Sequence, residues 1–199
     1  MRRALILALP LLVVAAGCGG TKTVTVTNTI TQTHTVTVTK PKPPAATTTT
    51  TQTASTPCAA GALQATFEGV EGSAGAGQIS YDLKLTNTSS TPCFVSGIPQ
   101  GQLLGTTGNA LPTTISLEPG QGGGSKVTLQ HNGSATAEAR FSPDVPGQGD
   151  SQSPGQCQPT STVLRITAPG GGTVDAPVQP PTSVCERGSL HFRPFTASS

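Results

Sequence analysis

The sequence predicts an all-β domain, an antiparallel β-sandwich, preceded by an extended and largely disordered stalk. Three observations predict it. After residue 58, short apolar or alternating runs are separated by glycine, proline, asparagine and serine. No long stretch of the chain shows the helical spacing of apolar residues. A threonine-rich segment of low complexity precedes these runs, and its composition is typical of a stalk.

Residues 1–17 are predicted to be a lipoprotein signal peptide. Arg2 and Arg3 precede an apolar run of about 13 residues, which ends in small residues. A membrane-spanning helix needs about 20 residues, so this run is too short for a permanent span. Cys18 follows the small residues directly, and this arrangement resembles the signal of bacterial lipoproteins, in which that thiol is acylated. We therefore expect Cys18 to be the lipid attachment site. The alternative is an ordinary secretory signal cut elsewhere.

The cysteine count agrees with export and acylation. If Cys18 carries lipid, an even number remains: Cys58, Cys93, Cys157 and Cys185. Disulfides persist in the oxidising compartment that export implies. Of the three pairings that four cysteines allow, Cys58–Cys93 and Cys157–Cys185 are favoured because they close the shorter loops. A zinc site is the competing use, but zinc cysteines commonly stand two to four residues apart, and these are about 28 or more apart.

Residues 18–57 are predicted to be a tether rich in threonine and proline. Threonine occupies every odd position from 21 to 39, mostly alternating with apolar residues. Such alternation favours a strand, but a single unpaired strand is unstable. We therefore expect an extended, unpaired segment, which at full stretch reaches on the order of 120 Å. The alternative is that residues 23–38 add a strand to a sheet edge, in this chain or in a partner.

Residues 58–199 are predicted to be one β-sandwich domain of ordinary size. The clearest strand has Tyr81 and Leu83 on one face and Asp82 and Lys84 on the other, the two-residue period of a half-buried strand. Residues 141–159 are expected to form a long loop, tied at its far end by Cys157. The predicted strands are residues 62–70, 78–86, 93–98, 102–104, 113–117, 126–131, 135–141, 163–167, 173–178 and 190–195.

The order of several short elements resembles a family of actinobacterial secreted domains, the domain of unknown function 4232. The elements are Cys58, Asn87 with Cys93, Gly97 with Pro99, the turn at residues 117–120, and Cys157 with Cys185. Ile98 departs from the family, which commonly has an aromatic residue there. The resemblance implies an immunoglobulin-like sandwich, and many members of the family are lipoproteins. It implies no activity, because the function of the family is not established.

No motif in the sequence specifies a reaction. The nucleophile elbow Gly-x-Ser-x-Gly is absent. His131 and His191 stand without partners in the sequence, so each is interpreted as an ordinary polar residue rather than a catalytic base. The glycine runs 122–124 and 170–172 lack the lysine of a phosphate loop and are interpreted as hairpin connections. Glu68, Glu71 and Asp82 are interpreted as a solvated acidic face rather than a glycosidase pair.

The composition also excludes some partners. Without the signal peptide, nine basic and nine acidic residues remain, so there is no excess of positive charge for nucleic acid. No metal or cofactor is expected. The predicted protein is anchored at the outer face of the bacterial cell membrane and displays a non-catalytic binding module, whose partner is an envelope protein or polysaccharide. The alternatives are a structural spacer whose working part is the tether and, less favoured, a hydrolytic enzyme.

Overall fold

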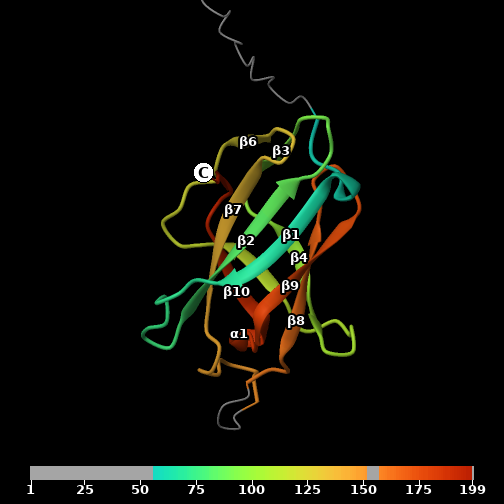
Figure 1. Ribbon diagram of the computed structural model, residues 1–199. Coiled ribbons are helices and arrows are strands. Elements are labelled where there is room, and N and C mark those ends of the chain that lie inside the picture. The colour runs from blue at the N-terminus through green and yellow to red at the C-terminus, as the bar shows by residue number, and fades with distance from the viewer. Residues whose placement is uncertain (1–55, 152–156, 199) are drawn as a thin grey trace, which may run out of the picture. The chain divides into compact units, whose positions relative to one another are not determined.

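Eleven strands and two short helices run through residues 56–151 and 157–198, which the computed structural model describes (Figure 1). The all-β prediction is confirmed. The predicted signal peptide, and all of the predicted tether before Thr56, lie outside the described residues. The elements are η1 (Ala60–Ala62), β1 (Leu63–Gly69), β2 (Ile79–Asn87), β3 (Cys93–Ser96), β4 (Gln100–Gly105), β5 (Thr114–Leu117), β6 (Lys126–Leu129), β7 (Ser134–Phe141), β8 (Ser161–Thr167), β9 (Thr173–Thr182), α1 (Cys185–Gly188), β10 (Ser189–Phe192) and β11 (Thr196–Ala197).

Nine of these strands form one sheet that nearly closes into a barrel. The strand order is β4-β8-β9-β1-β2-β7-β10-β5, and β11 pairs with β7. The seam between β4 and β5 is bridged in part: the Leu111 N–H donates to the carbonyl of Leu103 at 2.9 Å, and the Leu103 N–H donates to the Thr113 hydroxyl at 2.9 Å. The Gln102 amide also donates to the Leu111 carbonyl and to the Thr113 hydroxyl. Backbone and side-chain hydrogen bonds therefore bridge part of the seam that strand pairing leaves open.

The sheet is mixed: most of its pairs are antiparallel, as predicted, and two are parallel. β1 pairs with β9 in parallel, with Phe67 opposite Val178. β10 pairs with β5 in parallel, with Leu190 opposite Ile115. Parallel partners require a crossover rather than a tight turn, and these strands are far apart in the chain. The local patterns that predict strands carry no information on such distant partners.

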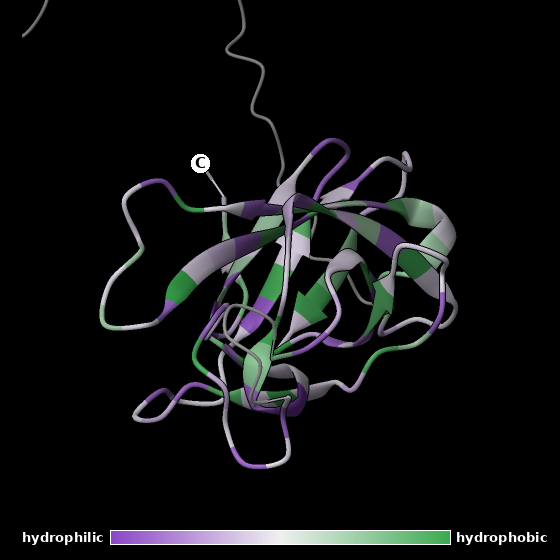
Figure 2. Cartoon of the chain, turned by 90° about the horizontal axis from the view of Figure 1, so that it is seen from below, coloured by the Kyte–Doolittle hydropathy of each residue, from purple (hydrophilic) through white to green (hydrophobic). Residues whose placement is uncertain are grey.

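The core lies inside the barrel and follows the two-residue period of the strands. On β2, Tyr81, Leu83 and Leu85 are buried, whereas Lys84 is exposed. The prediction that Tyr81 belongs to the core is confirmed, and its hydroxyl donates to the Pro180 carbonyl at 2.8 Å. In the view along the barrel, hydrophobic and hydrophilic residues alternate along several of the strands (Figure 2).

Strands β3 and β6 form a separate two-stranded sheet near one end of the barrel. This arrangement corrects the interpretation of residues 122–124 as a hairpin connection, because β5 and β6 belong to different sheets. Gly124 has φ of +75°, and a Cβ atom there would lie 2.4 Å from the Cβ of Pro194. The glycines at this crossing therefore allow a close approach to the C-terminal segment. Residues 170–172 do connect a hairpin, β8 with β9.

The two short helices were not predicted. η1 and α1 have three and four residues, and α1 contains Glu186 and Arg187 in the left-handed region, with φ of 53° and 57°. Helices this short leave no apolar periodicity in a sequence. Among the described residues, no helix combines the length and the apolar character that crossing a bilayer requires.

Candidate functional site

The candidate binding site is a pocket of about 350 Å³ in the mouth of the barrel. We call it the mouth pocket. Its apolar walls come from strands that are distant in sequence: Leu85 on β2, Val95 on β3 and Ile166 on β8. Ile98, which follows β3, and Phe195, which follows β10, complete the walls. Barrel mouths are common places for small-ligand sites, because strands converge there around a cavity.

The mouth pocket lies at the end of the barrel where the chain enters the domain, which we call the entry end. Pro57 forms a parallel bridge with Phe94 on β3, the strand that contributes Val95 to the pocket. The Cys58 N–H donates to the Phe94 carbonyl at 2.9 Å, and the Cys58 carbonyl accepts from Gly170 at 2.8 Å. The incoming chain is therefore bound between β3 and the turn that follows β8.

Local backbone geometry shapes the corner of the pocket. Gly97 has φ of +68°, a left-handed conformation that glycine adopts without steric cost. This residue turns the chain out of β3, and Ile98 and Pro99 follow before β4 begins. The Gly97 carbonyl accepts a hydrogen bond from the Phe195 N–H at 2.9 Å. The Gly97–Pro99 step of the sequence is thus the corner that joins β3, the pocket and the C-terminal segment.

The chemistry of the mouth pocket is that of an uncharged apolar site. Leu85, Val95 and Ile166 are each about 1% exposed, so they belong to the packed core beneath the pocket and have little free surface. The exposed polar residues of the lining are Ser96 and Thr167, each with a hydroxyl, and Gln100, with an amide. None of the lining residues is ionisable. The arrangement therefore suits binding of a slender apolar group, and it offers no acid or base beside a hydroxyl.

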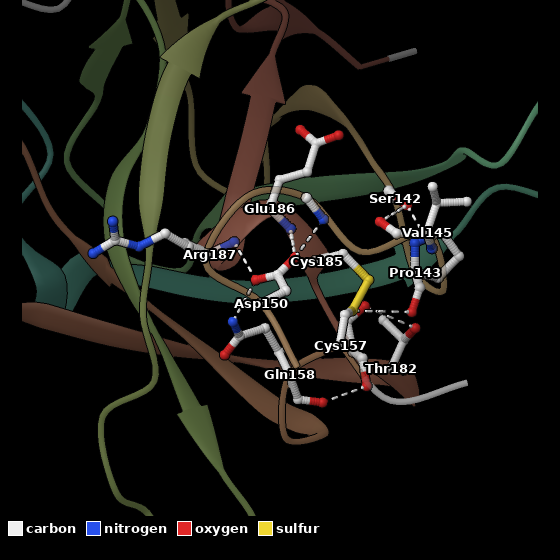
Figure 3. Close-up of a disulfide and its surroundings, with 12 residues drawn as sticks. Ser142, Pro143, Val145, Asp150, Cys157, Gln158, Thr182, Cys185, Glu186 and Arg187 are labelled. Carbon is white, nitrogen blue, oxygen red and sulfur yellow. Dashed lines mark hydrogen bonds between the residues drawn. A yellow bond between two sulfur atoms is a disulfide. The ribbon is translucent and has the colours of Figure 1, made fainter. Parts of the chain in front are cut away.

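A second organised region lies at the opposite end of the barrel, which we call the loop end: residues 142–151, residues 157–160 and α1 (Figure 3). There the Asp150 carboxylate accepts hydrogen bonds from the backbone N–H groups of Gly147 at 2.8 Å, Glu186 at 2.5 Å and Arg187 at 2.8 Å. It also accepts from the Gln158 amide at 2.6 Å. One side chain thus joins the long loop to the left-handed turn of α1.

These contacts change the acidity of Asp150. Desolvation by burial raises the pKa of its carboxyl group, but the hydrogen bonds outweigh that effect. The Gln158 amide is the largest of these lowering contributions, followed by the backbone groups of Gly147, Arg187 and Glu186. The net pKa therefore lies below the ordinary aspartate value, and Asp150 is ionised at neutral pH.

Asp150 also lies beside the Cys157–Cys185 disulfide. The carboxylate and the two sulfur atoms lie within 4.8 Å of one another, and they are a group of three potential metal ligands in the described part of the chain. The sulfur atoms are bonded to each other, however. A metal needs cysteine as thiolate, so the oxidised protein has no thiolate ligand to offer here. The group is a structural junction.

The structure gives the two disulfides that loop length favours, Cys58–Cys93 and Cys157–Cys185. All four cysteines are buried. Cys58 and Cys93 belong to the hydrophobic core, whereas the other pair ties the loop to α1. Cys18, the predicted lipid attachment site, lies outside the described residues.

The acidic residues considered in the sequence are only partly brought together. Glu68 lies opposite Asp82 on the neighbouring strand, and Asp82 lies opposite Glu138 on the next. Burial, and secondarily the charge of Glu138, raise the pKa of Asp82. Glu138 itself contacts Arg193 at 3.3 Å. Glu71 lies outside this row, in the turn that follows β1.

The histidines lie apart from the mouth pocket. His131 is exposed, and its Nδ1 lies 3.0 Å from the Ser89 carbonyl oxygen. His191 on β10 is half-buried, with Nδ1 2.9 Å from the Ser116 hydroxyl and Nε2 3.4 Å from the Ser189 hydroxyl. A catalytic Ser–His pair needs a group that orients the imidazole as a base, commonly a carboxylate. Here the second ring nitrogen contacts a hydroxyl instead.

Asn87 is a structural residue, which the sequence indicates only through the family resemblance, together with Cys93. It is fully buried. Its amide nitrogen donates to the carbonyls of Thr91 at 2.9 Å and Leu129 at 3.0 Å, and its side-chain oxygen accepts from Ser89. The Asn87 side chain therefore links the end of β2 to β6. An asparagine directly after an apolar strand is also a common turn residue, so the sequence does not separate the two roles.

Comparison with known proteins gives one match. Among curated proteins and among solved structures, no match is found. A family model described as "Domain of unknown function (DUF4232)" matches residues 58–196, which includes both disulfides and every residue that lines the mouth pocket. The resemblance inferred from the cysteine and turn pattern is thus confirmed over most of the chain, which belongs to the DUF4232 family.

Proposed function

We propose that this chain is a membrane-anchored envelope lipoprotein that displays the barrel as a non-catalytic binding module. In this proposal, Cys18 carries the lipid, residues 18–57 are the tether, and the mouth pocket is the binding site. The protein acts at the outer face of the bacterial cell membrane, where its partner is an envelope component.

The observation that carries the proposal is the pairing of the cysteines. The sequence has five cysteines, and the two disulfides use four of them. Cys18 is the cysteine left over, and it stands directly after the small residues of a signal-like segment. An unpaired cysteine in an exported protein needs another use. Acylation at this position supplies that use, and the chains of a diacylglycerol anchor hold a protein at a membrane more stably than a single chain.

The binding role is supported by the difference between the two candidate regions. The mouth pocket is apolar and open to a ligand, whereas Asp150 and the Cys157–Cys185 disulfide are occupied in holding the loop end together. The hydroxyls of Ser96 and Thr167 lie on the pocket without an ionisable neighbour in the lining. This environment favours binding over bond cleavage, because a hydroxyl nucleophile needs an adjacent base.

Anchoring is tested by replacing Cys18. The full chain and its Cys18→Ser variant are expressed in a bacterium that makes lipoproteins, and membrane and soluble fractions are compared. The proposal predicts that the unsubstituted chain is found in the membrane fraction and that Cys18→Ser is released. Thr21→Ser, a hydroxyl-for-hydroxyl change three residues away, is the control and should stay in the membrane fraction. Equal partition of Cys18→Ser and the unsubstituted chain would contradict the anchor.

Binding at the mouth pocket is tested by photo-crosslinking in intact cells. A crosslinking amino acid replaces Ser96, at the mouth pocket, or Val145, which is exposed at the loop end. The proposal predicts a crosslinked species of defined mass at Ser96 and none at Val145. Identical crosslinking from both positions, or from neither, would favour the spacer alternative. In that case an unrelated domain substituted for residues 58–199 should preserve the function of the chain in the cell.

A further inference from the structure

The mouth pocket also indicates the chemistry of its ligand, and this step rests on the binding role proposed above. We propose that the pocket takes the end of one linear aliphatic chain, from a separate lipid molecule whose polar head carries no charge. The argument uses the charge, the width and the rim of the pocket.

The lining excludes a charged group. None of its side chains is ionisable. A charge that enters such a site loses its hydration and gains no ion partner, which disfavours its binding. Hydrocarbon has no such penalty, and its transfer out of water is favourable. The buried part of the ligand is therefore hydrocarbon.

The size and the walls select a slender chain rather than a ring. The volume of about 350 Å³ is near the lower limit for ligand pockets, which span about 300–1,000 Å³, so the pocket holds part of a ligand. Phe195 is only 5% exposed, and Leu85, Val95 and Ile166 are about 1% exposed. A flat ring needs a broad exposed face for stacking, as an aromatic platform provides. The Phe195 ring is too covered to stack on a ligand, so the pocket fits the end of a methylene chain better than a flat ring.

The rim fits an uncharged polar head. Ser96, Gln100 and Thr167 are exposed members of the lining, with two hydroxyls and one amide among them. Hydroxyls and amides both donate and accept hydrogen bonds, which matches an alcohol, ester or amide linkage. The occupant is thus an amphiphile with a neutral head at the rim and its chain in the mouth of the barrel.

The test uses 1-decanol as the probe and the full-length chain carrying Cys18→Ser, so that no acyl chain of its own competes. Backbone amide shifts are followed by nuclear magnetic resonance during titration. We expect saturable shifts at the amides of residues 95–98, 100 and 166–168, and at least tenfold weaker binding of decyltrimethylammonium, which has the same chain and a charged head. The absence of saturable shifts at these residues up to the solubility limit of decanol would overturn the proposal, as would equal binding of the two probes.

A matched pair of variants tests the location. Ile98 and Ile79 are both half-buried isoleucines, but only Ile98 lines the mouth pocket. Ile98→Trp should weaken decanol binding at least tenfold, and Ile79→Trp should leave it unchanged. If Ile98→Trp does not fold, the positions of the shifted amides in the chain with native Ile98 still show whether decanol binds at the mouth pocket. Equal loss of binding in two folded variants would contradict this location.

The remaining comparisons separate this inference from the function on which it rests. If the acylated chain from membranes fails to bind decanol while Cys18→Ser binds it, the protein's own lipid is the occupant, and the proposal of a separate lipid is wrong. If a partner crosslinks at Ser96 but decanol does not bind, the binding role stands and the aliphatic ligand is wrong. If decanol binds but Cys18 carries no lipid, the ligand stands and the anchor is wrong.

Discussion

Each end of the barrel contains a disulfide, but the two disulfides join different parts of the structure. At the entry end, Cys58–Cys93 lies in the hydrophobic core and fastens the incoming chain to β3. At the loop end, Cys157–Cys185 ties a long loop to α1 and adjoins Asp150. The entry end thus combines apolar packing with the buried amide of Asn87, whereas hydrogen bonds to one carboxylate hold the loop end. The mouth pocket lies at the entry end, among residues of this core.

The largest expected effect comes from removing each disulfide by a pair of alanines. The sequence separations are 35 and 28 residues, so loop-closure entropy predicts a loss of about 4 kcal/mol of unfolding free energy in each case. Cys58→Ala with Cys93→Ala should cost at least 1 kcal/mol more than the other pair, because it also removes core contacts. Denaturant unfolding measures both. Equal losses would contradict the distinction between the two ends.

The next largest loss of unfolding free energy is expected from replacing Asn87 at the entry end. Asn87→Ala removes the donors to the carbonyls of Thr91 and Leu129 and leaves a cavity at a fully buried position. We expect a loss of about 3 kcal/mol, from unsatisfied buried carbonyls. The matched change at the loop end, Asp150→Ala, should cost less because water can reach the groups it exposes. Equal unfolding midpoints for Asn87→Ala and the unsubstituted chain would show that the network is not needed.

Asp150 makes the loop end sensitive to acid. Its folded pKa is lowered, so its contribution to stability is fully present above the unfolded value of about 4 and is lost as the pH falls through the folded pKa. Asp150→Asn should lower the unfolding free energy by about 1 kcal/mol at pH 7, and this difference should shrink below pH 4. Thermal unfolding at several pH values tests this. A difference independent of pH would mean that the charge of Asp150 is not involved.

The smallest change in unfolding free energy is expected for Asp82, which lies on β2 between the two ends of the barrel. Burial and Glu138 raise the folded pKa of Asp82, so ionisation of Asp82 opposes folding at neutral pH, and the penalty disappears in acid. Asp82→Asn should therefore raise the unfolding free energy at pH 7 by about 0.5 kcal/mol and change nothing near pH 3. Asp175→Asn should instead destabilise slightly, because it breaks the pair with Arg165. Destabilisation by Asp82→Asn at pH 7 would contradict the sign of the shift.

The strands could be predicted from the sequence, because their signals are local. The alternation of Tyr81 and Leu83 with Asp82 and Lys84 locates β2 and its buried face without knowledge of any partner. The pairing of the cysteines was also accessible, because shorter loops cost less entropy to close. The parallel pairs β1–β9 and β5–β10 were not, since they depend on how distant strands meet when the sheet closes.

The mouth pocket could not be predicted from the sequence. Leu85, Val95 and Ile166 have the signature of ordinary core residues, and they become pocket walls only because three strands converge at one barrel mouth. The Gly97–Pro99 step belongs to the family resemblance, but nothing local in the sequence shows that Ile98 lines the pocket. Asp150 carries no signal either, because its partners Glu186 and Arg187 lie 36 and 37 residues away.

The most direct test of the proposed function is the intact mass of the mature protein purified from membranes of a lipoprotein-producing bacterium. We predict a chain that begins at Cys18, heavier than its sequence by a diacylglycerol group and lighter by the four hydrogen atoms that the two disulfides remove. A chain that keeps residues 1–17, or one that begins at Cys18 with an unmodified thiol, would contradict the anchor and the location built on it.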